Sequence, residues 1–236
     1  MIKQIAQTAG FSGLLAALFL TLLQSFWVSP LILQAETYEN TAPAIEHEHA
    51  QATVERGHDH VSHEHDEEAW APEDGLQRIL FTGLGNLVVA VGFALMLAGL
   101  YVVRAPRKTW WGLLWGLAGF ATFNLAPSVG LPPEVPGAAA ADLLLRQYWW
   151  IGTAAATAVG MGLLAFGRHW ALRLVGLILL PIPHLIGAPH PEAHESLAPA
   201  ALAQEFIYAS LFTNALFWAV LGFATAWFFT RSQHTP

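Results

Sequence analysis

The sequence contains no cysteine. Disulfide-bonded scaffolds, iron–sulfur clusters and thiolate zinc sites all need cysteine, so all three are excluded. Any metal ion must therefore be bound through nitrogen and oxygen ligands. Lys3 and Lys108 are the only lysines, and no GxxxxGK[ST] motif occurs. The chain therefore does not hydrolyse ATP through a P-loop.

Charged residues are also scarce. They make up 11% of the 236 residues, whereas hydrophobic residues make up 55%. An ordinary globular domain has roughly a quarter of its residues charged. This composition predicts an all-α integral membrane protein with the lipid bilayer as its solvent. Nucleic acid is not an expected partner, because no basic patch is present to neutralise phosphates.

Long uncharged runs predict where the chain crosses the membrane. A helix needs about 20 apolar residues to cross a hydrocarbon core of roughly 30 Å. Residues 11–33, 79–103 and 206–230 meet this requirement clearly, and residues 110–127 and 147–167 are just long enough. Residues 174–187 are interrupted by Pro181 and Pro183, which predicts a broken span, a re-entrant segment, or a span completed by residues 170–172 with Arg173 snorkelling to the interface. The first run is too long for the h-region of a signal peptide, so we interpret it as a retained span.

The positions of the basic residues favour six spans over five. Lys and Arg accumulate in cytoplasmic loops, and six spans with a cytoplasmic N-terminus place seven basic residues inside and three outside. Five spans would give six against four. We therefore predict a bundle of six transmembrane helices, with five as the alternative, and one long loop on the outer side. The predicted divisions are a first helix over 1–33, the outer loop over 34–77, a helix bundle over 78–231 and a cytoplasmic tail over 232–236.

The outer loop is acidic and rich in histidine. Residues 34–77 contain twelve of the seventeen carboxylates, six of the eleven histidines and only one basic residue, Arg56. Residues 46–68 read EHEHAQATVERGHDHVSHEHDEE, which contains three H-x-H pairs. Alternate residues of an extended chain share a face, so each pair can offer two imidazoles to one ion. With few apolar residues to bury, the loop is predicted to be disordered without metal.

Imidazole and carboxylate ligands together suit borderline divalent ions such as Co²⁺, Ni²⁺ and Zn²⁺. Binding should depend on pH, because an imidazole must lose its proton before it can bind a metal. An acidic, solubilising loop whose histidines are incidental is the simpler alternative. The predicted metal ligands of the loop are His47, His49, His58, His60, His63, His65, Asp59 and Glu64.

Further polar residues lie beside the proline-interrupted segments. Asn124 and Glu134 lie among the prolines of FNLAPSVGLPPEVPG. His184 and His190 lie within PIPHLIGAPHPE, and His194 follows that motif. An ionisable residue at membrane depth is a functional candidate by default. We therefore add Glu134, His184, His190 and His194 to the predicted metal ligands, on a path that also passes Asn124. A rigid outer turn at Glu134 and a capped, structural His184 are the alternatives.

Several longer motifs carry a family resemblance. They are WVSPLILQAETYE, EAWAPEDGL, FNLAPSVGLPPEVPG, RQYWW, PHLIGAP and ASLFTNALFWAVLG. With them the chain resembles the probable cobalt transporter subunit CbtA family. The resemblance implies a multi-pass protein of the bacterial inner membrane that takes up cobalt for cobalamin synthesis. It also implies a small one-span partner, CbtB, with its own histidine motif, and a bundle of about five spans.

Residues and resemblance together predict a subunit that captures a divalent ion, cobalt by resemblance, at the outer loop and passes it inward. The first alternative is a membrane-anchored subunit that buffers or senses metal without transporting it. The second is a metalloenzyme, which would need about three preorganised ligands and an acid or base within the membrane. Only His184 qualifies at that depth, so we predict that the chain is not an enzyme.

Overall fold

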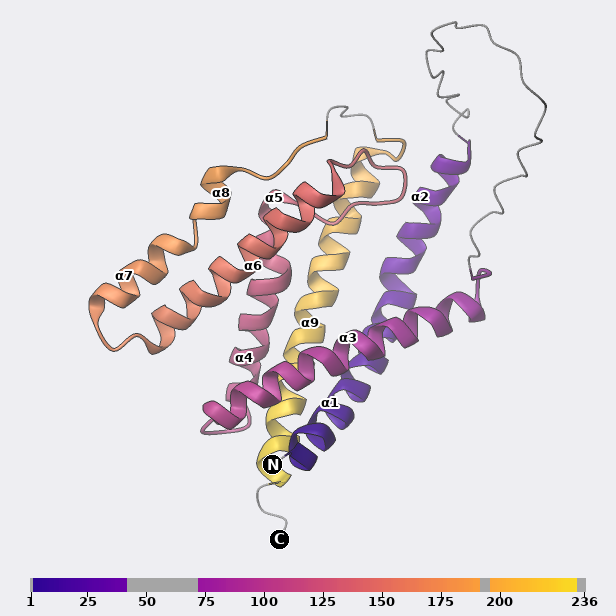
Figure 1. The fold of residues 1–236 in the computed structure, drawn as a ribbon. Helices are drawn as coiled ribbons and strands as arrows, with labels where there is room; N and C mark the ends of the chain where they lie inside the picture. The colour runs from indigo at the N-terminus through magenta and orange to yellow at the C-terminus, as the bar shows by residue number, and fades with distance from the viewer. Residues whose placement is uncertain (1, 42–71, 192–195, 233–236) are drawn as a thin grey trace, which may run out of the picture.

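The computed structural model describes residues 2–41, 72–191 and 196–232 (Figure 1). Every regular element in the described residues is a helix. In chain order these are α1 (Ile2–Leu23), the π-helical η1 (Gln24–Val28), α2 (Ser29–Thr41), α3 (Leu76–Val103), α4 (Trp111–Phe120), the π-helical η2 (Ala121–Leu125), α5 (Ala126–Gly130), α6 (Leu143–Phe166), α7 (Trp170–Leu179), α8 (Ile182–Ile186) and α9 (Ala200–Ser232).

Five of the predicted spans are confirmed as helices long and apolar enough to cross a membrane. They cover Ile2–Glu39, Leu76–Val103, Trp111–Gly130, Leu143–Phe166 and Ala200–Ser232. The first helix does not stop at residue 33 but continues to Thr41, so the start of the predicted outer loop is helical. The predicted sixth span is part of a shorter apolar stretch, Trp170–Ile186, which is divided into α7 and α8.

The α7–α8 segment forms a hairpin with α6. Midway along the hairpin, a Cβ atom built on Gly160 would lie 2.9 Å from the Gly176 carbonyl oxygen, so the two backbones are in close contact. At the α8 end, the Trp149 indole Nε1 donates a hydrogen bond of 3.1 Å to the Pro183 carbonyl. The interruption between α7 and α8 falls at Pro181, because proline has no N–H to donate and its ring clashes with the preceding turn. The segment therefore runs back along the full height of α6.

Both termini of the described chain lie at the same end of the bundle (Figure 1). The Gln4 side-chain amide donates a hydrogen bond of 3.4 Å to the Phe229 carbonyl, which joins the start of α1 to the end of α9. The chain therefore passes along the bundle an even number of times, and α7–α8 is the shortest pass. A chain with six spans has both termini on the same side of the membrane. Only five of the described helices are long enough to span on their own.

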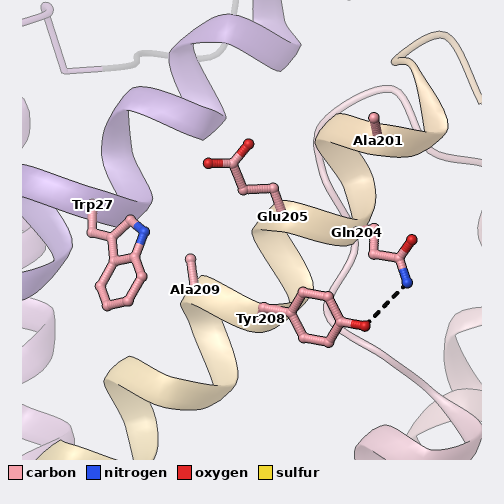
Figure 2. Close-up of a pocket in the computed structure, with 6 residues that line it drawn as sticks. All are labelled: Trp27, Ala201, Gln204, Glu205, Tyr208 and Ala209. Atoms are coloured by element: carbon pink, nitrogen blue, oxygen red, sulfur yellow. Dashed lines mark hydrogen bonds between the residues drawn. The ribbon is translucent and has the colours of Figure 1, made fainter.

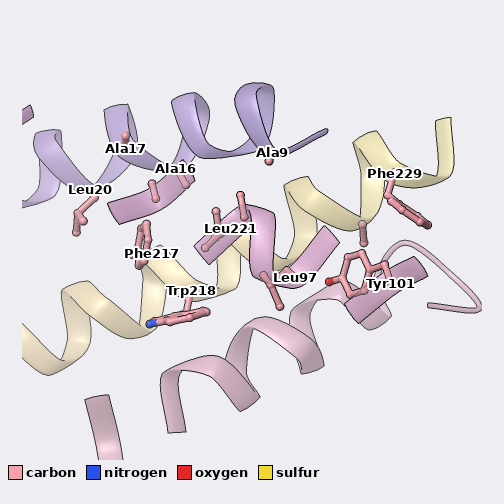
Figure 3. Close-up of a cluster of buried hydrophobic side chains, with 13 residues drawn as sticks. Ala9, Ala16, Ala17, Leu20, Leu97, Tyr101, Phe217, Trp218, Leu221 and Phe229 are labelled. Carbon is pink, nitrogen blue, oxygen red and sulfur yellow. The ribbon is translucent and has the colours of Figure 1, made fainter. Parts of the chain in front are cut away.

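The main core lies where α1, α3, α4 and α9 meet (Figure 3). Trp218 of α9 is 1% exposed and stacks on Phe123, with ring centroids 5.7 Å apart. Tyr101 of α3 is fully buried and packs edge-on against Phe229. A second cluster, at the far end, joins α2 to the start of α9 and to the loop around Val135. Helix α9 belongs to both clusters and so is the central helix of the bundle.

Glycine allows two of these helix contacts to be closer than an alanine would permit. A Cβ atom on Gly13 of α1 would lie 2.8 Å from the Val91 Cα atom of α3. A Cβ atom on Gly222 of α9 would lie 2.7 Å from the Gly116 Cα atom of α4. The Gly112–Gly116 pair is a GxxxG motif, and it packs against α9 of the same chain.

Candidate functional site

The two ends of the bundle carry opposite charges. The end that holds the termini also holds the α3–α4 and α6–α7 turns, and in the described part of the chain it contains no carboxylate. Its basic residues are Lys3, Arg104, Arg107, Lys108, Arg168, Arg173 and Arg231. The opposite end holds every carboxylate that the structure describes and two arginines: Glu36, Glu39, Glu73, Asp74, Glu134, Asp142, Glu205, Arg78 and Arg146. The acidic end therefore attracts cations.

An ion-pair network joins α2 to the start of α3. Arg78, in the first turn of α3, donates hydrogen bonds to the carboxylates of Glu36 on α2 (3.0 Å) and of Asp74 (2.8 Å). Each carboxylate is only partly screened from water, so the pairs add little to stability individually. Their effect is to hold α2 and α3 together on either side of residues 42–71.

The predicted loop ligands His47, His49, His58, His60, His63, His65, Asp59 and Glu64 lie outside the described residues, as does His194. Among the residues that the structure describes, no group of three or more His, Asp or Glu side chains could hold a metal ion. Glu134, His184 and His190 are therefore not brought together into one site. Each of them has its own surroundings.

Glu134 lies at the acidic end, in the loop between α5 and α6. Its carboxylate accepts a hydrogen bond of 2.8 Å from Arg146 in the first turn of α6. Both side chains are about 70% buried, with 29% and 28% of their surface exposed. Glu134 therefore has a cationic partner, and a metal ion would have to compete with that arginine for the carboxylate.

Asn124 lies in the π-helical turn η2 and is hydrogen-bonded to a residue of α9. Its side-chain oxygen accepts a hydrogen bond of 2.8 Å from the Trp218 indole Nε1. A π-helical turn displaces the side chains of one turn from their usual positions and occurs often at functional sites. Here it directs an amide towards the buried Trp218, so Asn124 is already engaged in a contact between helices.

His184 lies in α8 and its ring meets the Trp149 ring edge-on, with centroids 5.8 Å apart. Its Nδ1 atom is buried and has no hydrogen-bond partner within the described structure. An imidazole nitrogen in this state is costly unless something else occupies its lone pair or takes its proton. His190 lies beyond α8 and is exposed. One buried nitrogen without a carboxylate neighbour does not make a metal site alone.

A polar cluster that the sequence analysis missed joins α1 to α3. The Asn86 side-chain amide donates to the Thr21 hydroxyl (3.0 Å) and to the Gln24 side-chain oxygen (2.7 Å). Gln24 begins the other π-helical turn, η1. The signal was present as a single amide, Asn86, inside the apolar run 79–103. Each π-helical turn thus carries an amide side chain bound to another helix.

An open hollow of about 490 Å³ lies beside the outer half of α9 (Figure 2). We call it the Glu205 hollow, after the carboxylate that points into it. Across the hollow stands the Trp27 indole of η1, and on the flank of α9 the Gln204 amide donates a hydrogen bond of 3.2 Å to the Tyr208 hydroxyl. The lining residues are Trp27, Ala201, Gln204, Glu205, Tyr208 and Ala209.

The fold and its charges define a multi-pass helical membrane protein with one basic and one cation-attracting end. More particularly, the chain belongs to the family described as probable cobalt transporter subunit (CbtA), whose model matches residues 2–230. It is thus a transporter subunit, as the motifs of the sequence predicted. No curated protein and no solved structure matches the chain.

Proposed function

We propose that this subunit captures a divalent cation, cobalt above all, at its acidic end and passes it across the bacterial inner membrane to supply cobalamin synthesis. The separation of charge between the two ends is the observation that carries the proposal. Basic residues accumulate on the cytoplasmic side of membrane proteins. The termini then lie in the cytoplasm, and the histidine-rich segment lies on the outer face, where metal arrives.

The chemistry of capture follows from the ligands. His47, His49, His58, His60, His63 and His65, with Asp59 and Glu64 among them, offer exchangeable nitrogen and oxygen ligands to Co²⁺, Ni²⁺ or Zn²⁺. The acidic end raises the local concentration of cations beside this segment. Glu134, His184, His190 and His194 are the proposed ligands further along the path. Of these, His184 has the strongest support, because its buried Nδ1 lacks a partner in the described structure.

A partner subunit completes the transporter in this proposal, and we take it to be the small one-span protein CbtB. The described helices offer no set of three metal ligands and have a tightly packed core. Both features favour a path that the chain forms together with a partner over one through its own centre. They also favour the second candidate, a membrane-anchored subunit that buffers or senses metal.

Cobalt uptake into proteoliposomes separates the two candidates. Transport predicts uptake of cobalt when the chain and CbtB are reconstituted together. Deletion of residues 46–68 should then raise the metal concentration that uptake requires. Replacing His184 with Ala should then reduce the maximal rate, while Ala replacement of the exposed His169 at the basic end should not. Buffering predicts that no preparation takes up cobalt, and that deletion of residues 46–68 abolishes cobalt binding.

A further inference from the structure

The first two helical hairpins of the chain repeat one sequence pattern. Residues 25–30 read SFWVSP and residues 122–127 read TFNLAP, so both follow the pattern [ST]-F-x-[VL]-[SA]-P. A D-x-x-x-R pattern then covers the start of the second helix of each hairpin, as DGLQR at 74–78 and DLLLR at 142–146. At the same distance after each arginine follow VGFALMLAG and VGMGLLAFG. The shared order of these matches indicates an internal repeat.

Both copies of the proline motif form the same unusual structure, a π-helical turn. In η1 the Ser29 N–H donates to the Gln24 carbonyl, and the equivalent bond in η2 joins Ala126 to Ala121. The residue that follows is proline in both copies, and it has no N–H to offer the next carbonyl of the turn. Proline and π-helical turns are two of the known causes of helix kinks. Each of the two helices can therefore bend at the same point of the repeat.

An ion pair joins the two helices of each hairpin at the acidic end. Glu36 lies beyond η1 and Glu134 beyond η2, and each pairs with the arginine of D-x-x-x-R, at 3.0 Å for Arg78 and 2.8 Å for Arg146. Arg78 donates through two nitrogens to both oxygens of Glu36. The four side chains keep 28–32% of their surface exposed, so dissolved ions can reach them.

Below each ion pair the second helix of the hairpin contacts the π-helical turn. Asn86 of α3 donates to Gln24 of η1, at 2.7 Å. Trp150 of α6 packs against Phe123 of η2, with ring centroids 6.1 Å apart. Helix α9 runs between the two proline-containing helices and contacts both turns (Figure 1). The segment beyond each turn is thus held by an ion pair at its outer end and by packing at the bend.

We propose that the two ion pairs Glu36–Arg78 and Glu134–Arg146 form the outer gate of the transporter, which an arriving divalent cation opens by replacing the arginines on both carboxylates. At equal distance a divalent ion attracts a carboxylate about twice as strongly as a guanidinium does. Once the arginine is displaced, the segment beyond each π-helical turn bends away from its partner helix at the proline. The inference rests on the proposed function, since it assumes that the cation arrives at the acidic end.

The absence of cysteine makes the gate measurable, because one introduced thiol is the only one in the chain. Val28→Cys places it in η1 and Thr122→Cys in η2, where the native side chains are 7% and 6% exposed. Spheroplasts that express the chain with CbtB are treated with a charged maleimide that does not cross membranes. Labelling should be slow without metal. Co²⁺, or Arg78→Gln combined with Arg146→Gln, should accelerate it roughly fivefold, which is as much as a partly exposed ion pair contributes.

Three control variants separate opening of the gate from general loosening of the bundle. Arg146→Lys keeps the cationic partner of Glu134 and should keep labelling slow. Gln204→Ala removes a neutral hydrogen bond at the same end, 3.2 Å long, to Tyr208, and should leave labelling unchanged. Ala98→Cys introduces the thiol at a fully buried position in the half of α3 nearer the basic end, and it should stay unlabelled in every background.

The proline is tested separately. Pro127→Ala restores a backbone N–H and should reduce the response of Thr122→Cys to Co²⁺. An unreduced response would overturn bending at this proline. Labelling that is indifferent to Co²⁺ or to the two Arg→Gln changes would overturn the gate, and so would equal acceleration at Ala98→Cys.

Cobalt uptake by proteoliposomes that contain the same variants and CbtB distinguishes failure of the gate from failure of the proposed function. Uptake, with labelling that responds neither to Co²⁺ nor to loss of the arginines, would reject the gate and leave transport standing. Labelling that responds to both, without uptake by any preparation, would reject transport and leave the opening by cations standing.

Discussion

The close contact between α1 and α3 can be tested with two glycines of the same helix. Gly13 is buried, and a Cβ atom there would lie 2.7 Å from Val91 Cγ2, 2.8 Å from its Cα and 2.9 Å from its backbone nitrogen. Gly10 is exposed, and a Cβ atom there would meet nothing within 4 Å. Alanine favours the helix over glycine by about 0.5–1 kcal/mol at either position.

The two substitutions should therefore change stability in opposite directions. Gly10→Ala keeps the gain in helix propensity. Gly13→Ala adds a clash with backbone atoms, which can be relieved only if α1 and α3 move apart by several tenths of an ångström. Overpacking of this kind costs about 1–3 kcal/mol. We expect the free energy of unfolding to differ between the two variants by about 2 kcal/mol, with Gly13→Ala the less stable.

Unfolding in mixed micelles, titrated with sodium dodecyl sulfate, measures this difference. The ten tryptophans provide the fluorescence signal. Because both variants add one methyl group to the same helix, propensity and lipid partitioning largely cancel. Equal stabilities for Gly10→Ala and Gly13→Ala would show that the helices are not in backbone contact at Gly13, and the packing described for α1 and α3 would be wrong.

Three further predictions concern single contacts and the outer loop. Trp218→Phe removes the indole donor to Asn124 and should lower the free energy of unfolding by about 1 kcal/mol in the same titration. An unchanged free energy of unfolding would show that the 2.8 Å hydrogen bond does not form. Arg146→Gln should change stability by less than about 1 kcal/mol but, by freeing the Glu134 carboxylate, alter cobalt uptake at limiting metal; unchanged uptake would remove Glu134 from the path. Calorimetry of the full chain should show that its affinity for Co²⁺ falls as the pH is lowered through about 6.5, where imidazoles gain protons. If the affinity did not change over this pH range, carboxylates and not histidines would be the ligands.

The sequence predicted the helices better than their contacts. Apolar length alone was enough to identify the spans around residues 11–33, 79–103 and 206–230, because lipid leaves a backbone few alternatives to a helix. The ends were less predictable. Helix α2 continues to Thr41 through polar residues, and its Glu36 meets Arg78, whose position depends on α3. Such pairing between distant segments leaves no local pattern.

The candidate site shows the same limit. The sequence singled out Glu134, but it did not predict that Arg146 would pair with the Glu134 carboxylate, since the two meet only when the loop between α5 and α6 folds back on α6. It singled out Asn124 as a polar group near a proline, but not the π-helical turn that directs it to Trp218. The sequence did not single out Glu205 as a candidate, because a hollow depends on what lies across it, here Trp27.

The central position of α9 has a consequence for how the protein is made. Helices α1 and α3 contact each other directly, and α6 pairs with α7, so both hairpins can assemble as soon as they leave the ribosome. Helix α4 packs chiefly on α9, which is synthesised some eighty residues later. Until α9 arrives, the glycine face of α4 and the polar amide of Asn124 have no permanent neighbour in the membrane. A nascent chain that stalls in this interval presents an unfinished bundle to the quality-control proteases of the membrane.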